Sequence, residues 1–193
     1  MTLNSAELRS IDEDQARSLS AGVKRHPIYI ILENVLDTYN IGGFFRLAEA
    51  VAAEKIYLCG ECAAPPDHKI VKASVGTYKL VPWEKKKTAR AALADLRSVR
   101  GLQVVAVEQS PASRDYRKIR YNFPIAFVFG HETTGITEDT LDLVDDIIEL
   151  PMYGINKSLN VMVAAGIALY YALGKCRKDR VRFLKKWRSS SSS

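Results

Sequence analysis

The sequence lacks several features that would each point to a particular class of protein. No apolar run reaches the ~20 residues of a membrane-spanning helix, and the N-terminus does not have the pattern of a signal peptide. Only three cysteines occur, Cys59, Cys62 and Cys176, and this odd, low count argues against a disulfide framework. We therefore expect a protein of the reducing cytoplasm that does not enter a membrane.

Glycine-rich phosphate cradles are also missing. The sequence contains neither G-x-G-x-x-G nor G-x-x-x-x-G-K-[ST], so the usual nucleotide-binding loops are excluded. Cys59 and Cys62 have C-x-x-C spacing, but no second such pair exists and only His68 lies nearby as a further zinc ligand. We therefore expect no metal, and a metal or redox protein built on this pair stays a minor alternative.

Composition and charge describe one body with a basic appendage. The 193 residues are 47% hydrophobic and 26% charged, which suits a single globular domain. Residues 175–188 contain eight bases and one acid, so they carry +7 while the rest of the chain sums to −1. Such a tail commonly meets a polyanion, although a solvated helix face would look the same.

The chain divides into a helical leader (1–26), a main domain (27–174) and a basic tail (175–193) whose terminal serine run should be disordered. The tail residues expected to contact such a polyanion are Lys175, Arg177, Lys178, Arg180 and Arg182.

Short apolar runs alternate with helical patterns along the main domain. We expect strands at 28–32, 55–59, 78–81, 102–108, 123–129 and 147–150. Residues 69–76 look like a polar connection. This alternation predicts an α/β fold, with a mostly parallel sheet and helices on both faces.

The expected helices follow from caps and periodicity. Ser5 should cap a helix in the leader, and Asn40 should cap a helix over 41–53. Thr137 should cap a short helix, and Ser158 should cap a helix that runs through Leu173 and is buried on most sides. A further helix should begin at 85–87 and end at Gly101.

Polar loops follow three of the apolar strands, at 33–40, 130–135 and 150–158. Ligands of open parallel sheets bind beyond the carboxyl ends of strands, where the strand order switches. If the three loops converge there, they form one crevice.

A second polar segment, 111–121, combines bases with aromatic residues. Arg114, Arg117 and Lys118 alternate with Tyr116 and Tyr121, a mixture able to touch phosphates and stack on bases. An ordinary solvated loop is equally compatible with this composition.

The loops also carry motifs of a known family. Residues 40–46 read N-I-G-G-F-F-R, residues 129–136 read F-G-H-E-T-T-G-I, and residues 150–152 and 158–161 read L-P-M and S-L-N-V, followed by A-A-G at 164–166. In this order and spacing they resemble the three motifs of the SpoU family of RNA ribose 2′-O-methyltransferases, in the SPOUT superfamily. The resemblance covers about residues 27–174.

This resemblance implies S-adenosylmethionine as methyl donor, a homodimer, and a SPOUT-type fold with a C-terminal trefoil knot. By position, it implies cofactor-binding roles for Gly130, Leu150, Met152, Ser158 and Leu159. It implies catalytic or substrate-positioning roles for Asn40, Arg46, Glu132, Ser158 and Asn160. The short leader and basic tail look closer to the relatives that act on tRNA than to those that act on rRNA. A non-catalytic RNA-binding relative is the competing class.

The residue types suit the implied chemistry. A ribose hydroxyl is a poor nucleophile until its proton is removed or its oxygen becomes more acidic. The resemblance casts Arg46 as the base, but a guanidinium keeps its proton up to pH ~12, and only strong desolvation beside other positive charge would make it neutral. We therefore expect Arg46 to hold the adjoining phosphate and stabilise the developing alkoxide. Asn40 and Ser158 could each be helix caps and nothing more.

Overall fold

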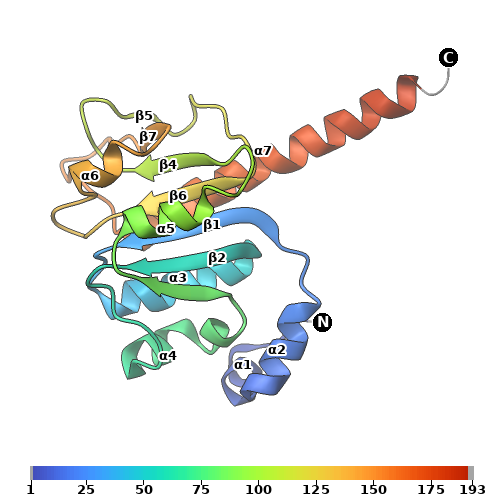
Figure 1. Cartoon of the computed structure of the whole chain (residues 1–193), viewed down its shortest axis with the longest axis vertical. Helices are drawn as coiled ribbons and strands as arrows, with labels where there is room; N and C mark the ends of the chain where they lie inside the picture. The colour runs from blue at the N-terminus through green and yellow to red at the C-terminus, as the bar shows by residue number, and fades with distance from the viewer. Residues whose placement is uncertain (1, 191–193) are drawn as a thin grey trace.

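A computed structural model describes the backbone of residues 2–190 and the side chains of residues 2–176. Seven strands form one sheet in the order β3-β2-β1-β6-β4-β7-β5, and every neighbouring pair is parallel (Figure 1). The strands are β1 (His26–Glu33), β2 (Ala53–Cys59), β3 (Trp83–Lys86), β4 (Gln103–Val107), β5 (Arg114–Asp115), β6 (Ile125–Phe129) and β7 (Asp146–Glu149). Five of the six expected strands are confirmed to within two residues at each end.

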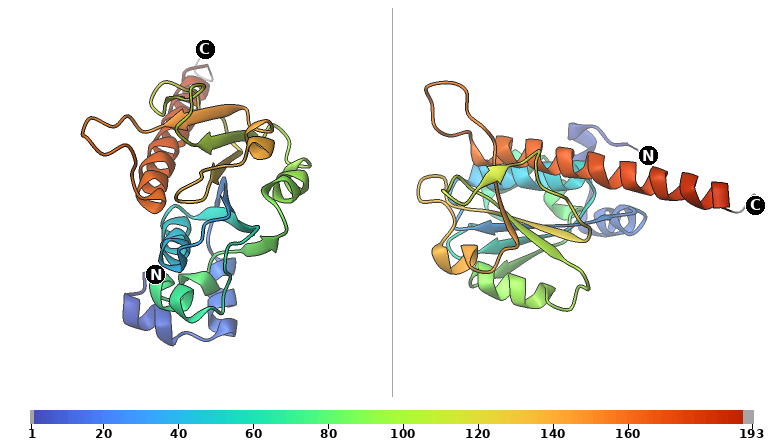
Figure 2. Two further views of the ribbon diagram at one scale, coloured as in Figure 1. Left: turned by 90° about the vertical axis from the view of Figure 1, so that its left-hand side faces the viewer. Right: turned by 90° about the horizontal axis from the view of Figure 1, so that it is seen from above.

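Apolar side chains on both faces of the sheet explain why helices cover both sides. In β1, Ile30 and Leu32 belong to one core and Ile31 to the other, as the two-residue period of a strand requires. The first core is covered by α3 (Thr38–Ala50), α4 (His68–Ser74) and α7 (Val161–Ser190); α5 (Ala89–Leu96) covers the second, beside α6 (Glu138–Leu141) (Figure 2). The predicted α/β class with helices on both faces is confirmed.

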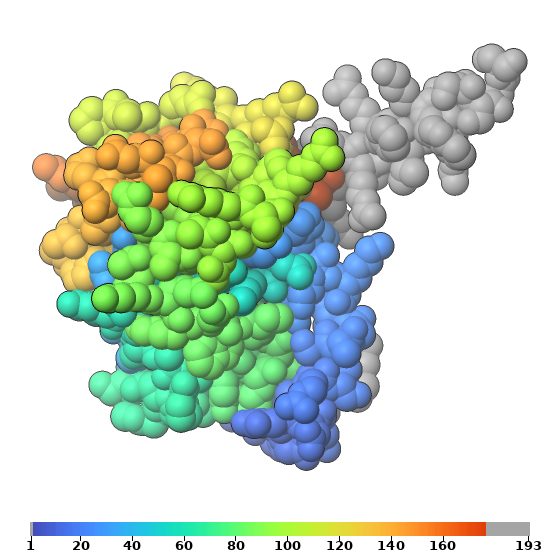
Figure 3. Space-filling model, in the orientation of Figure 1, coloured from blue at the N-terminus to red at the C-terminus, as the bar shows by residue number. Residues whose placement is uncertain are grey.

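The leader forms two helices instead of the single one expected. They are α1 (Ser5–Ser10) and α2 (Glu13–Ala21), and their caps are Asn4 and Asp12, not Ser5. Each helix begins with a reciprocal capping box. The cap of α2, Asp12, lies only two residues after Ser10, the last residue of α1. Figure 3 shows these residues (dark blue) against the body of the molecule.

Leader and body are joined by hydrogen bonds as well as by packing. Ser20 Oγ and Arg25 Nη2 both donate to the carbonyl of Leu80, at 2.8 and 2.7 Å, and Lys79 Nζ donates to the carbonyl of Ile11 at 2.6 Å. The leader is therefore a docked element of the fold.

The segment between β2 and α5 differs most from expectation. The predicted connection at 69–76 is mostly α4, whose cap Asp67 accepts hydrogen bonds from the amides of Lys69 and Ile70. The predicted strand at 78–81 is wrong: residues Thr77–Lys79 form a 3-10 turn, η1. The strand that pairs with β2 lies at 83–86 instead.

The expected helix start at 85–87 is also wrong, because Lys86 belongs to that edge strand. Its ammonium pairs with Glu84 and with Asp95 of α5, each at 2.5 Å, and these ion pairs satisfy its charge on the edge strand. α5 instead begins after Thr88, whose hydroxyl accepts from the amide of Ala91, and it ends at Leu96, before Gly101.

α7 is capped by Asn160, not by Ser158. Asn160 Oδ1 accepts from the amides of Met162 and Val163 at 2.9 and 3.3 Å. The helix continues without a break to Ser190, beyond the body of the molecule (Figure 1). The basic tail is thus an extension of the core helix, and Ser189 and Ser190 are helical, against the predicted disorder. The side chains of residues 177–190, and residues 191–193 altogether, lie outside the described part.

The expectation that α7 is buried on most sides is wrong for the single chain. Ala165, Ala168, Leu169 and Ala172 face the sheet and are inaccessible to solvent. The opposite side is apolar yet exposed, with Val163 at 44%, Ile167 at 38% and Tyr170 at 54%. The sheet can cover only one side of a helix that lies on it, which leaves a bare apolar stripe on α7. No helix in the described part of the chain is long and apolar enough to cross a membrane.

Candidate active site

One side chain from each of the three motif loops joins a continuous chain of hydrogen bonds. Asn160 Nδ2 donates to Asn40 Oδ1 at 2.9 Å, and Asn40 Nδ2 donates to Glu132 Oε1 at 2.9 Å. Glu132 also accepts from the backbone amides of Leu36 and Asp37, each at 3.2 Å. The predicted convergence of the loops is confirmed, and β1 and β6, whose loops meet here, are the neighbouring strands at which the chain order switches.

Asn40 reaches this network because it is not the helix cap that the sequence suggested. α3 begins earlier, and its cap is Asp37, whose carboxylate accepts from the amide of Tyr39 at 2.8 Å. Asn40 therefore lies within the first turn, where its side chain is only 6% exposed. A buried amide must satisfy its donors and acceptors, and Asn40 does so with the two other loops.

Glu132 is held as a carboxylate. Its partial desolvation would raise the pKa, but the hydrogen bonds from Asn40 and from the nearby backbone amides outweigh that effect, so the pKa lies below its ordinary value. At neutral pH Glu132 is therefore an acceptor that draws the start of α3 and the 130–135 loop together.

A pocket of about 570 Å³ lies beyond the carboxyl ends of β4, β6 and β7. Its lining contains Glu132 and Asn160 together with all five residues expected to bind the cofactor, which are Gly130, Leu150, Met152, Ser158 and Leu159. Phe129, Val161 and Ala164 add apolar wall. The size, and the mixture of apolar wall with a few polar groups, fit a nucleoside-sized ligand.

The charge of the pocket fits a cationic ligand. Three carboxylates line it, those of Glu108, Glu132 and Glu149, and its described lining contains no lysine or arginine. S-adenosylmethionine carries a sulfonium and an ammonium against one carboxylate, so an acidic, partly apolar pocket is complementary to it. The residues present thus fit the cofactor that the motifs imply.

Arg46 lies apart from this network. It follows Gly42 by four residues and Gly43 by three, so all three share one face of α3. A Cβ at Gly42 would overlap Ala73 of α4, and one at Gly43 would lie 2.9 Å from the side chain of Met162 in α7. Arg46 therefore emerges at the surface between α4 and α7, exposed and without a hydrogen bond or ion pair to any described residue.

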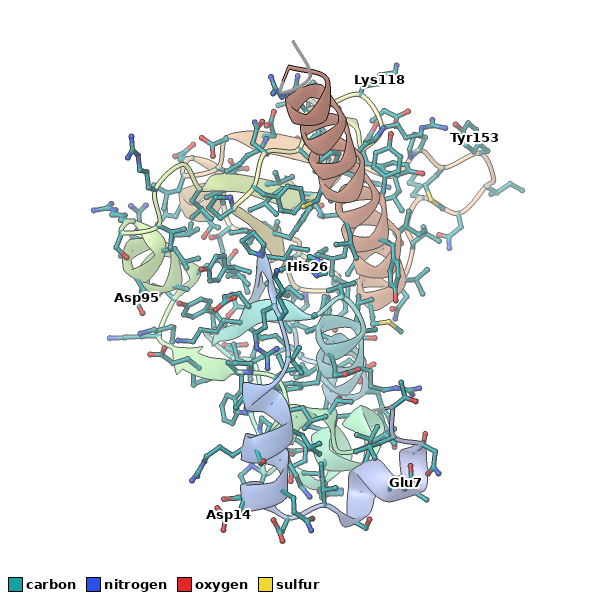
Figure 4. The ribbon with its side chains drawn as sticks, turned by 90° about the vertical axis from the view of Figure 1, so that its right-hand side faces the viewer. Glu7, Asp14, His26, Asp95, Lys118 and Tyr153 are labelled. Atoms are coloured by element: carbon teal, nitrogen blue, oxygen red, sulfur yellow. The ribbon has the colours of Figure 1, made fainter. Side chains whose placement is uncertain are left out.

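The basic loop after β4 is partly structural. Arg114 pairs with Asp146, and Arg117 pairs with Asp115 at 2.5 Å, which lowers the pKa of Asp115 to about 2. Arg117 also donates to the hydroxyl of Tyr153 at 3.3 Å. Figure 4 shows Tyr153 on a projecting loop and Lys118 pointing outward near α7. Of the three bases singled out here, Lys118 is the one not tied by an ion pair.

Cys59 and Cys62 are both buried. Burial, together with the neighbouring Cys62 and Glu33, raises the pKa of Cys59 to about 12, and burial also raises that of Cys62. A reactive or metal-binding cysteine needs a thiolate, so neither thiol is suited to that role. No group of three or more metal-ligating side chains occurs among the described residues.

The sequence did not indicate that two further carboxylates, those of Glu33 and Glu108, hold a loop of the site. Glu33 and Glu108 directly end or follow apolar strands, and both accept hydrogen bonds from the segment after Gly135. The signal was available, since each is an acid at the carboxyl end of a buried strand, but spacing alone does not say which loop such an acid will hold.

An all-parallel sheet with an acidic pocket beyond the carboxyl ends of β4, β6 and β7, next to the switch between β1 and β6, is typical of an α/β protein that binds a small cofactor at its carboxyl edge. The chain belongs to the SpoU rRNA Methylase family, whose model matches residues 27–170. S-adenosylmethionine is the cofactor of this family.

Individual relatives agree with this membership. The tRNA (guanosine(18)-2′-O)-methyltransferase of Escherichia coli strain K12 is 32% identical over 161 residues, which are 81% of this chain and 68% of that protein. The AdoMet-bound rRNA methyltransferase of Sinorhizobium meliloti is similar in structure, with a TM-score of 0.70 and 29% identity over 86% of this chain and 59% of that one.

The A. aeolicus TrmH/SpoU tRNA modifying enzyme matches with a TM-score of 0.72 and 27% identity, over 93% of this chain and 97% of that one. The curated relatives that this chain matches are longer than it is, and it spans 57 to 76% of their length.

Proposed function

We propose that this protein transfers a methyl group from S-adenosylmethionine to a ribose 2′-hydroxyl of structured RNA, with tRNA favoured over rRNA. The observation that carries the proposal is the hydrogen-bonded chain from Asn160 through Asn40 to Glu132. It lies at the rim of a pocket that fits the cofactor. A purely structural joint would not require three polar side chains from three loops to meet at such a rim.

The residues divide the work between cofactor and ribose. When bound, S-adenosylmethionine would supply an electrophilic methyl group for the 2′-oxygen, with S-adenosylhomocysteine as the leaving group and the hydroxyl proton passing to solvent. Gly130, Leu150 and Leu159 would hold the cofactor, with Met152 and Ser158. Glu132, Asn40 and Asn160 would position the nucleotide. Arg46 would hold the adjoining phosphate and stabilise negative charge on the 2′-oxygen.

A homodimer would bring Arg46 to a pocket. Arg46 emerges on the outer side of α3, away from the sheet, and the exposed stripe of Val163, Ile167 and Tyr170 faces outward on the adjacent α7. Contiguous exposed apolar surface of this kind marks an interaction site. Pairing two copies through this surface would bury the stripe and carry Arg46 of the partner subunit toward the Glu132 network.

RNA binding would use the exposed bases outside the pocket. Lys118 is one, Arg114 and Arg117 are available only where their ion pairs open, and the tail from Lys175 to Arg182 adds five bases on an extended helix. The tRNA preference rests on likeness, because the E. coli tRNA (guanosine(18)-2′-O)-methyltransferase is 32% identical to this chain and the A. aeolicus tRNA modifying enzyme matches it over 93% of its residues.

Two further features are part of the proposal, and membership of the family supports both. They are a SPOUT-type trefoil knot formed by the C-terminal segments, and action in the cytoplasm. The two buried thiols suit a reducing compartment.

The decisive experiment is methyl transfer from labelled S-adenosylmethionine to total RNA from cells that lack this protein, followed by size separation and mapping of the ribose-protected position. Label in the tRNA fraction at one 2′-O-methylated nucleotide is expected. Label in rRNA would replace the substrate and keep the reaction. Cofactor binding without transfer to any RNA would favour the non-catalytic relative and overturn the proposal.

A further inference from the structure

The turn that carries Glu132 is closed on itself. The amide of His131 donates to the carbonyl of Gly135 at 3.1 Å, and the amide of Gly135 donates back to the carbonyl of His131 at 2.9 Å. A Cβ at Gly130 would overlap the backbone of Gly135 and Ile136. The loop is therefore narrow, because Gly130 and Gly135 lie in close contact at its base. Its tip consists of Glu132, Thr133 and Thr134.

The imidazole of His131 makes hydrogen bonds to the backbone of its own turn. Its Nδ1 accepts from the amides of Thr133 at 2.9 Å and Thr134 at 3.2 Å. A ring nitrogen that accepts two hydrogen bonds carries no hydrogen, so in the neutral ring the hydrogen lies on Nε2. His131 thus organises the tip of the turn through one specific atom.

The exit of the turn is held separately. Glu108 Oε2 accepts from the amide of Ile136 at 2.9 Å, and Glu33 Oε2 accepts from the amide of Thr137 at 3.0 Å. The Thr140 hydroxyl also donates to Glu33, at 2.7 Å. A change at His131 should therefore loosen the tip while the entry from β6 and the exit into α6 stay in place.

We propose that His131 is a positioning residue for methyl transfer, because its Nδ1 holds the turn in the conformation that aims Glu132 at Asn40 and the start of α3. The proposal rests on the proposed function above. His131 acts through Glu132, so its loss should lower turnover more than it lowers cofactor affinity.

Three variants separate the two ring nitrogens. In His131→Asn the side-chain oxygen can occupy the position of Nδ1, whereas in His131→Gln the amide reaches the position of Nε2, and His131→Ala has neither. We expect kcat to fall about tenfold or more in the Ala and Gln variants and to stay within about threefold in the Asn variant. His131 also lines the cofactor pocket, so the Kd of S-adenosylmethionine, measured by calorimetry, should change in the Ala and Gln variants, but by a smaller factor than kcat. Rescue by Gln but not by Asn would overturn the proposal and assign the effect to Nε2.

Two NMR measurements test the hydrogen bonds of His131 without RNA, one on the unaltered protein and one on the Ala variant. At pH 8, ¹⁵N NMR of the histidine side chains should show His131 with its hydrogen on Nε2, and the amides of Thr133 and Thr134 should exchange faster with solvent in the Ala variant. A hydrogen on Nδ1, or exchange unchanged by the substitution, would contradict the assignment. Absence of methyl transfer by the unaltered protein would instead refute the proposed function and leave this measurement valid.

Discussion

Asn40 uses both ends of one amide: its Oδ1 accepts from Asn160 and its Nδ2 donates to Glu132, each at 2.9 Å. Glu132 can only accept, so the amide cannot be reversed without facing two like groups. Both hydrogen bonds therefore run in the same direction: Asn160 at the start of α7 donates to Asn40, and Asn40 donates to the carboxylate of Glu132. This polarity makes the identity of residue 160 testable apart from its role as a helix cap.

Asn160→Asp should keep the protein stable and remove its activity. Aspartate caps a helix as well as asparagine, but it cannot donate to Asn40 Oδ1. Asn160→Ala should also lose activity, and its lost cap should cost about 1 kcal/mol of unfolding free energy. Thermal unfolding and methyl transfer measured on both variants separate the two roles. Normal turnover by the Asp variant would show that the donation to Asn40 is unimportant.

The elements found from sequence are those that a buried strand or a regular cap defines. β1 and β6 are continuous apolar runs covered on both faces, and such runs leave little choice of structure. At 78–86 the pattern misled, because the segment predicted as a strand begins in the 3-10 turn at Thr77–Lys79, whereas the charged segment Trp83–Lys86 forms the edge strand. Lys86 of this strand pairs with Asp95 of α5, and Glu84 pairs with Lys55 of β2; these contacts between elements are ones that no local pattern encodes.

The sequence indicated which loop residues would meet, but not how each of them is held. The motifs identify Asn40, Glu132 and Asn160, and the structure brings them together. The roles of Asp37 and Asn160 as caps were missed, since each lies two or three residues from another good cap. His131 was overlooked because its partners are backbone amides of its own turn, and a sequence does not show which side chain will fold back on its own loop.

Arg46→Ala should abolish methyl transfer while leaving cofactor affinity nearly intact. Arg46 is exposed and is not among the pocket-lining residues, so in the proposed mechanism its removal would take away phosphate and alkoxide stabilisation without touching the cofactor. Turnover and calorimetric cofactor binding should be compared with Arg100→Ala, a change at another exposed arginine, which we expect to be without effect. Near-normal methylation by the Arg46 variant would exclude two roles for Arg46, electrostatic stabilisation and removal of the hydroxyl proton as a general base.

Mixing two inactive variants should restore activity if the site is shared between subunits. In a dimer of one Arg46→Ala and one Asn160→Ala subunit, one pocket keeps its own Asn160 and receives Arg46 of the partner subunit. After random exchange of subunits, about a quarter of wild-type activity should return. If Arg46 serves its own pocket, every site is defective and mixing restores nothing. Activity should therefore be measured before and after exchange, with light scattering to confirm the dimer.

Deleting Lys175–Ser193 should weaken RNA binding and flatten its dependence on salt. The segment carries eight bases, and each lost phosphate contact should lower the slope of log K against log salt by about 0.7 to 0.9. Removing only Ser189–Ser193 is the matched control, because it shortens the tail without changing its charge. The measurement is RNA affinity at several salt concentrations. An unchanged slope in the longer deletion would exclude the tail from phosphate contact.

The buried thiol of Cys59 should make the fold sensitive to alkali. Its pKa is raised in the folded protein from an ordinary value near 9 to about 12, chiefly by burial. A raised pKa contributes stability that is complete below about pH 9 and is lost as pH rises toward 12, because the unfolded chain releases the proton first. Denaturant unfolding from pH 8 to 11 under reducing conditions should show this loss. Cys59→Ala should flatten part of it, whereas Cys176→Ser should not. Equal pH dependence in the wild type and in Cys59→Ala would mean that Cys59 ionises as easily in the folded chain as in the unfolded one, and would restore it as a candidate reactive thiol.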